Sequence, residues 1–177
     1  FPGISEALLR LYTAYREEQL ALADQDAEAR ADAGQDSPDP VAESRRFLAA
    51  RRNCFPALDE AAERLAQSVA ESDSLVGYLK ARHKLRVRRL PTTVMVGSTR
   101  RLDRHRGEIL LDDGLDTASQ VFQLALQLAY LEMRPDIDAV VEAGSFATES
   151  GERLTRRALA SYAAAAILMP YTAFAQI

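Results

Sequence analysis

The feature that most constrains this chain is a run from Thr117 to Met133 whose apolar residues fall on nearly every side of a helix. Thr117 or Asp116 can cap its start, and Pro135 ends it. Its large apolar residues are Val121, Phe122, Leu124, Leu126, Leu128 and Leu131. Because a helix without a polar face must be covered by other elements, we expect this one to be central and buried. A second long helix, predicted at about 151–168, is rich in alanine and can pack closely against it.

Three short segments before this helix have the pattern of strands. Residues 85–90 alternate between apolar and basic side chains. A second strand is predicted near 93–97, where residues 93–96 are rich in β-branched side chains. A third is predicted near 107–112, where 109–111 are apolar and an Asp-Asp-Gly turn follows. Residues 100–107 are interpreted as a hairpin connection. The sequence therefore predicts an α+β fold, with a small antiparallel sheet of about three strands packed on the buried central helix.

The first eighty residues are predicted to form helices without strands. Helices are predicted at 4–23, 41–52 and 56–70, with a short one through 75–79, and the stretch 24–40 between the first two is acidic and contains proline and glycine. We therefore expect a helical extension over 1–80 and a core over 81–177. The chain begins without Met and ends in an apolar stretch, so we expect a piece of a longer protein. No targeting or membrane segment is visible, which predicts a cytoplasmic location.

The composition disfavours an enzyme. A single cysteine excludes an internal disulfide and a cluster held by several thiolates of this chain. We expect Cys54 to be a buried small apolar residue. The two histidines, His83 and His105, are too few and too far apart to suggest a metal site. No catalytic residue and no metal ligand is predicted.

The formal net charge of −4 conceals a basic band. Between Ala81 and Arg106 there are nine Lys or Arg residues and one acid, Asp103, so this window carries +8. On an acidic protein such a band can bind anions, although a solvated strand face would have the same composition. On a strand, Lys84, Arg86 and Arg88 would share one face. An edge strand protected by basic side chains would look the same.

Two segments resemble the helices of the ImmA/IrrE metallopeptidase-like fold. FQLALQLAY at 122–130 is similar to the pattern FTLAHExGH, and ASYAAAAILMP at 160–170 is similar to the ending of EANxFAAxLLMP. Zinc binding by HExxH requires two histidines at i and i+4 with a glutamate base between them. Here Leu126, Gln127 and Tyr130 stand at those positions, and Leu159 stands at the third ligand position. The resemblance therefore implies the scaffold without its metal.

The ending ASYAAAAILMPYTAF also resembles the short-chain fatty-acyl transcriptional regulators, as does the long helical extension. That resemblance implies a sensor domain that binds a short-chain acyl-CoA such as propionyl-CoA and controls methylcitrate-cycle or glyoxylate-shunt genes. It also implies a DNA-binding domain before this chain and a cysteine-bearing region after it that can hold an iron–sulfur cluster. Regulators that read paired half-sites are usually dimers, so a homodimer is expected.

The resemblance implies that the basic band and the residues at the former metal-ligand positions together bind an acyl-CoA. Arginine and lysine suit the phosphates of coenzyme A, and an apolar cleft with phenol hydroxyls suits the acyl thioester. Arg16, near Tyr12 on the first helix, either closes the cleft or forms a surface ion pair. Leu126 either lines the cleft or fills the core. The candidate residues are Tyr12, Arg16, Lys84, Arg86, Arg88, Arg100, Arg101, Leu126, Tyr130, Leu159 and Tyr162.

Two other functions fit the same residues. A residual acyl-CoA hydrolase would need a base, which Gln127 cannot be, so His83 or His105 would have to reach the cleft. A pseudo-metallopeptidase that binds only proteins would have a filled cleft, with no volume near Tyr130.

Overall fold

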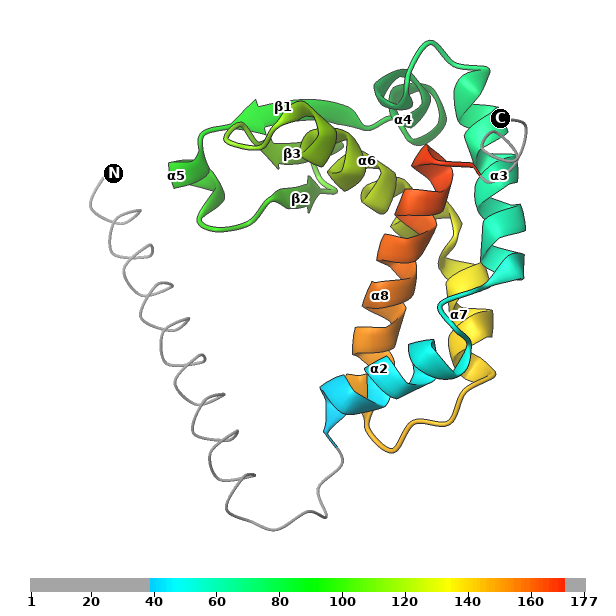
Figure 1. Ribbon diagram of the computed structural model, residues 1–177. Coiled ribbons are helices and arrows are strands. Elements are labelled where there is room, and N and C mark those ends of the chain that lie inside the picture. The colour runs from blue at the N-terminus through cyan, green and yellow to red at the C-terminus, as the bar shows by residue number, and fades with distance from the viewer. Residues whose placement is uncertain (1–38, 171–177) are drawn as a thin grey trace. The chain divides into compact units, whose positions relative to one another are not determined.

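The computed structural model describes residues 39–170, which form a helical assembly beside a small sheet (Figure 1). The predicted helix at 4–23, with Tyr12 and Arg16, lies outside the described residues. The α+β class is confirmed. The elements are α2 (Pro40–Ala50), α3 (Pro56–Ala70), α4 (Leu75–His83), β1 (Arg86–Leu90), α5 (Thr92–Met95), β2 (Arg100–Asp103), β3 (Glu108–Asp112), α6 (Thr117–Glu132), α7 (Arg134–Glu142) and α8 (Glu149–Leu168).

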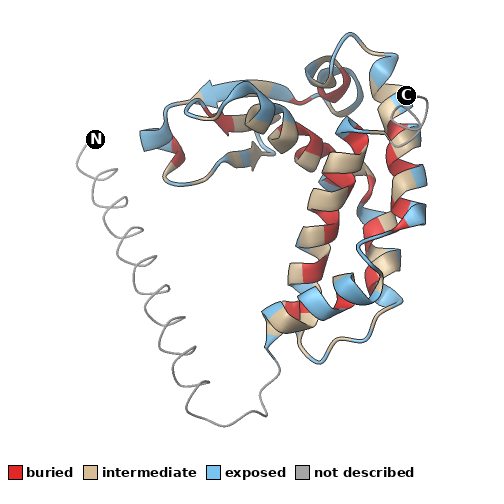
Figure 2. Cartoon of the chain, viewed as in Figure 1, coloured by how far each residue is buried: buried red, intermediate tan, exposed pale blue. Residues whose placement is uncertain are grey.

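The α6–α8 pair forms the centre of the fold (Figure 1). Leu128 and Ala129 of α6 and Ala160 and Ala163 of α8 have no exposed surface, and small side chains allow the two helices to approach closely. The buried residues lie on the inner sides of the helices (Figure 2). The expectation that α6 is central is confirmed, but it is not covered all round, because Tyr130 remains 39% exposed.

The sheet has three strands in the order β1-β3-β2. Strand β3 pairs antiparallel with β2 and parallel with β1, with Val87 opposite Ile109 and Leu102 opposite Ile109 from the other side. The sheet is therefore mixed, and the prediction of an antiparallel sheet was wrong in this respect. Both outer strands carry arginine, whereas the central strand contributes the fully buried Ile109 and the almost fully buried Leu111.

Two strand assignments were also wrong. The segment predicted as a strand at 93–97 is the single helical turn α5, and the residues 100–103 predicted as a connection form β2. Val96 and Gly97 both have positive φ, 47° and 71°, which breaks the extended backbone that a strand needs. The hydroxyl of Thr92 donates to Asp112 Oδ1 at 2.6 Å and ties α5 to the end of β3. Three β-branched residues in a segment of five were too few to distinguish a strand from a turn of helix.

Helices α2 and α3 pack directly on α8, so they share a core with the residues that follow the sheet. The described residues from Pro40 onward cluster as one unit, and the boundary predicted at residue 80 falls inside it. Phe47, Leu58, Ala62 and Leu65 bring the apolar faces of α2 and α3 into this core. Within residues 39–170, no helix is both long and apolar enough to cross a membrane.

Glu43 of α2 caps the start of α8. Its carboxylate accepts hydrogen bonds from the backbone N–H of Ala147, from the N–H of Thr148 at 3.3 Å and from the Thr148 hydroxyl at 2.7 Å. A Cβ at Gly151 would meet this carboxylate, so any larger residue there would require Glu43 to move. These contacts, the Thr148 hydroxyl first, hold the pKa of Glu43 below its usual range.

The change Glu43→Gln is expected to lower thermal stability at neutral pH, because the ionised form is the one that the cap stabilises. A lowered pKa contributes stability above the ordinary carboxylate pKa, and that contribution is lost as the pH falls through the pKa of the folded state. The variant should therefore be less stable than the wild type at neutral pH, and the two should converge in acid. Thermal melts across this range test it, and a constant gap at all pH values would contradict it.

Candidate functional site

The four positions that correspond to the metal site lie on α6 and α8, but they do not surround one cleft. Gln127 and Leu159 are buried, Leu159 completely, whereas Tyr130 is exposed and Leu126 is half-buried against the core. In the part of the chain that the structure describes, no three His, Cys, Asp or Glu side chains are grouped to hold a metal ion. The vacated ligand position on α8 is therefore filled by core packing.

Tyr162 lies on a different side of α8 from the Tyr130 site. Its hydroxyl donates to both carboxylate oxygens of Asp59 on α3, at 2.8 and 3.0 Å, and its ring meets Phe55 edge-on at 5.2 Å. The predicted cleft lined by both tyrosines with Leu126 and Leu159 is therefore not formed. Tyr162 instead links α8 to α3 through its hydrogen bonds to Asp59.

The raised pKa of Tyr162 predicts that the free energy of unfolding decreases at alkaline pH. Burial, and then the Asp59 carboxylate, raise the pKa of Tyr162 to about 12. Above the ordinary tyrosine pKa the unfolded chain loses this proton while the folded chain keeps it, so stability falls with pH until the pH passes about 12. Denaturant unfolding of Tyr162→Phe should show a weaker decline over this window. Equal declines in variant and wild type would contradict the assignment.

The basic side chains predicted to form a comb on one strand are divided between two elements. Lys84 is not in β1. It ends α4 in the left-handed conformation with φ 59°, and its Nζ donates to the carbonyl of Ala81 at 3.0 Å. Arg86 and Arg88 do share a face of β1, but both lie beside Glu108 of β3, at 3.3 and 3.9 Å. This pairing on an exposed edge strand matches the alternative of a solvated strand face.

Arg100 and Tyr130 are the predicted residues that the structure brings together. Arg100 of β2 donates from Nη1 to the carbonyl of Gln123 at 2.8 Å, and its Cζ lies 5.5 Å from the centre of the Tyr130 ring. Burial lowers the pKa of this guanidinium, and the Tyr130 hydroxyl opposes that effect. Arg101 turns away and donates to the carbonyl of Met95.

A pocket of about 380 Å³ opens beside Tyr130, between α6, α7, α8 and the β2–β3 turn. It adjoins the positions that correspond to the base and the second histidine, Gln127 and Tyr130, whereas Leu126 and Leu159 do not line it. Three arginines and one carboxylate set its charge, and Ile137 gives it an apolar wall. The lining residues are Arg104, Gln127, Tyr130, Arg134, Ile137, Asp138 and Arg156. An excess of guanidinium groups in a concave site favours an anionic ligand.

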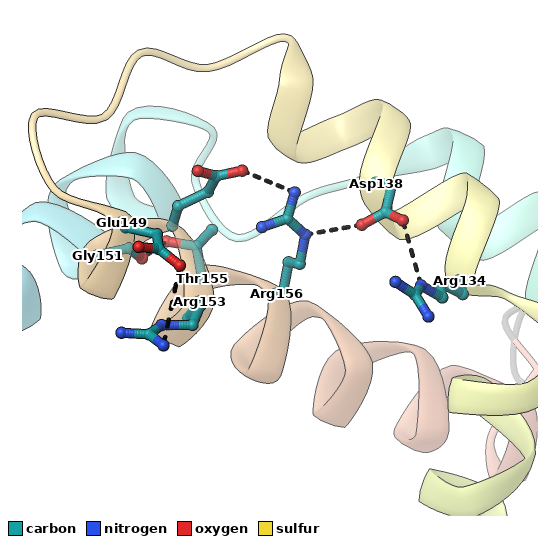
Figure 3. A network of polar contacts seen from close by, with 8 residues as sticks. Arg134, Asp138, Glu149, Gly151, Arg153, Thr155 and Arg156 are labelled. Atoms are coloured by element: carbon teal, nitrogen blue, oxygen red, sulfur yellow. Dashed lines mark hydrogen bonds and ion pairs between the residues drawn. The ribbon is translucent and has the colours of Figure 1, made fainter.

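A network of charged side chains links the two helices that border this pocket (Figure 3). Asp138 of α7 meets Arg156 of α8 at 2.7 Å through Oδ1 and Arg134 at 3.5 Å through Oδ2. Arg156 also meets Glu152, one turn earlier on α8, at 2.7 Å. The bond to Asp138, and with it the bond to Glu152, raises the pKa of Arg156. The positive charge at this wall of the pocket is therefore permanent.

The charged residues of the pocket were not selected as site residues from the sequence. Arg104 was counted in the basic band but not selected, and Arg134, Asp138 and Arg156 were not considered. Arg134 and Asp138 are spaced i,i+4 on a helix, as Glu152 and Arg156 are, and such pairs usually mean only a surface ion pair. The sequence did hold one indication that Arg156 lies near the site, because Arg156 precedes the third ligand position, Leu159, by one turn of helix.

A larger pocket, of about 450 Å³, lies on the other side of α7 against the start of α3. Its wall is mostly apolar, and Arg51 at its edge stacks on Phe47 and donates to the carbonyl of Ala143. Cys54 lines it and is exposed, so the prediction of a buried cysteine was wrong. Among the described residues that line this pocket, Arg51 is the single cation and already has partners, so the pocket binds an anion less readily than the one beside Tyr130.

The α6–α8 pair with its adjoining sheet defines a metallopeptidase-like scaffold whose ligand positions hold other residues. Residues 80–177 match the model of the IrrE N-terminal-like domain, Peptidase_M78, and the chain belongs to that family. The family resemblance predicted from the sequence is confirmed.

The chain is also similar to transcription regulators. It is 33% identical, over 98% of its length, to the HTH-type transcriptional regulator RamB of Mycobacterium tuberculosis, and 27% identical, over 99%, to the propionyl-CoA carboxylase regulator of Cereibacter sphaeroides. A solved structure of a Mycobacterium tuberculosis transcriptional regulator superposes with a TM-score of 0.70 and 26% identity, over 78% of this chain and 43% of that one. The chain spans 37–38% of the length of the two curated relatives.

Proposed function

We propose that this chain is the sensor part of a transcription regulator and that it binds a short-chain acyl-CoA such as propionyl-CoA. The observation that carries the proposal is the arginine-lined pocket beside Tyr130. The names of the similar proteins add support, since they are regulators and one is a propionyl-CoA carboxylase regulator. The genes controlled would then be those of short-chain fatty acid catabolism, through the methylcitrate cycle or the glyoxylate shunt.

The chemistry of the pocket suits this ligand class. Coenzyme A carries a pyrophosphate and a 3′-phosphate, and guanidinium groups bind phosphates in two-point contacts. Arg104, Arg134 and Arg156 supply such groups, and Arg100 adds charge behind the Tyr130 ring. The Tyr130 hydroxyl can donate to a thioester carbonyl, and Ile137 can contact a short acyl chain. Arg86, Arg88, Lys84 and Arg101 stay predictions as outer phosphate contacts.

The regulatory step is proposed to follow from unequal affinity for two conformations, because a ligand can shift an equilibrium only in that way. DNA binding would belong to a domain outside this chain, in a cytoplasmic homodimer. The segment before α2 would connect the sensor to that domain.

Two observations support this proposal over the two other functions. A protein-binding pseudopeptidase with a filled cleft would have no volume near Tyr130, whereas a pocket of about 380 Å³ opens there. A hydrolase that uses a histidine base would need His83 or His105 at the pocket. Neither histidine is among the described residues that line it, and His83 Nε2 is 2.6 Å from Glu132 Oε1.

Calorimetric titration with propionyl-CoA, free coenzyme A and propionate tests the proposal. Propionyl-CoA should bind more tightly than either fragment, because both ends of the ligand contribute. Dissociation constants above about 1 mM for all three would contradict it. Release of free thiol during long incubation with propionyl-CoA would instead support the hydrolase.

A further inference from the structure

Helix α7 lies between two pockets and is attached to its neighbours differently on its two sides. Ile137 and Asp138 face the pocket beside Tyr130, and Asp136, Ala139 and Val140 line the pocket on the other side. The apolar attachment of α7 is made by the buried Ile137 and Val141. Its charged attachment to α8 is the ion pair between Asp138 and Arg156 at 2.7 Å. This pair borders the proposed ligand pocket directly.

The carboxylate of Asp138 is placed as a bound anion would be. One of its oxygens contacts Arg156 and the other contacts Arg134, so a single carboxylate bridges two guanidinium groups. The three side chains are partly open to solvent, with 30% exposure for Asp138, 35% for Arg156 and 79% for Arg134. An incoming phosphate can therefore reach the same guanidinium groups that Asp138 holds.

We infer that Asp138 is a built-in competitor for the anionic part of the ligand, and that ligand binding moves the α7–α8 link from Asp138 to Arg134. In the free domain the carboxylate in the second turn of α7 holds Arg156. In the bound domain the anion bridges Arg156 and Arg134, so that α7 is attached through its first residue. The inference rests on the proposed function, because it describes how that same pocket would be regulated.

The exchange has an energetic and a structural consequence. Displacing an internal carboxylate lowers the affinity for the ligand, and this cost disappears when the competitor is neutral. Couplings of this kind typically change affinity by roughly 5- to 150-fold. The residues of α7 that follow Asp138 lose their charged anchor on α8 when the anion binds. Their amides should then exchange faster with solvent.

The test compares Asp138→Asn with Asp136→Asn, which removes the same charge from the same helix on the side away from the pocket beside Tyr130. Inorganic pyrophosphate and coenzyme A are titrated into each variant and into the wild type by calorimetry. Asp138→Asn should bind both roughly fivefold or more tightly than wild type. Asp136→Asn should change the affinities by less than about twofold, which is within the screening expected of a more distant charge.

The outcomes distinguish this inference from the proposed function. If wild type binds coenzyme A and Asp138→Asn binds it equally or more weakly, Asp138 is not a competitor and the inference is overturned, while the proposed function stands. If coenzyme A does not bind but pyrophosphate does, the proposed function fails and the pyrophosphate affinities decide the inference. If neither binds wild type, both are overturned.

Hydrogen exchange on the wild type provides a test that does not depend on the folding of a variant. Saturating pyrophosphate should lower the protection of the amides at 139–142 in α7, while those in the middle of α6 are unchanged. Unchanged or increased protection at 139–142 would overturn the movement of the link.

Discussion

Replacing Leu159 by alanine is expected to lower the free energy of unfolding by roughly 2–5 kcal/mol. The side chain has no exposed surface and lies in the core with Leu128. Truncation removes its apolar contacts and leaves a cavity that the surrounding helices close only in part. The position that corresponds to a metal ligand would then be shown to support the fold.

Leu168→Ala is the matched control, since the same side chain near the end of α8 is 37% exposed. Its loss should be clearly smaller, because less surface is returned to water. Urea unfolding of both variants with a shared slope gives the comparison. A loss below about 1 kcal/mol at Leu159 would mean that the core can collapse around the change.

The change Arg156→Gln is expected to weaken the binding of propionyl-CoA by roughly 10- to 150-fold. A hydrogen bond to a charged group contributes about 1.5–3 kcal/mol, which corresponds to that range of dissociation constants. Glu152 holds Arg156 at 2.7 Å and keeps this contact when an anion takes the place of Asp138, so the guanidinium is already oriented. Calorimetric titration measures the effect.

Arg157→Gln provides the control, because it removes the same charge from the next residue of α8, which is exposed and does not line the pocket. Its effect on affinity should be small and should fade with added salt. A thermal melt of each variant confirms that it is folded. Equal affinities for wild type and Arg156→Gln would place the ligand elsewhere on the domain.

The helices were predictable because their signals are local and long. Pro56 at the first position of α3 and Asp116 before α6, whose carboxylate accepts from the N–H of Ser119 at 2.6 Å, mark boundaries that the sequence shows directly. The sheet was less predictable, because the parallel pairing of β1 with β3 depends on partners far apart in sequence. A period of two over five residues does not say which strand lies beside it.

Of the residues selected from the sequence, Tyr130 lines the pocket, whereas the residues that give the pocket its charge were not selected. The HExxH comparison located Gln127 and Tyr130, and both line the pocket. It could not show that Tyr162 points toward Asp59, since residues on one helix diverge by about 100° per position and neighbouring helices decide which sides are free. Apart from Arg104, the charges of the pocket come from i,i+4 pairs on α7 and α8 that look like ordinary surface charges in the sequence.

The packing of α2 and α3 on α8 has a consequence for proteolysis. The exposed turn at 71–74 joins α3 to α4, and it is a natural place for a protease to cut. A cut there would not release a folded C-terminal domain, because the buried faces of α2 and α3 belong to the same core as α8. The two pieces would stay together as complementing fragments and would separate only when that shared core unfolds.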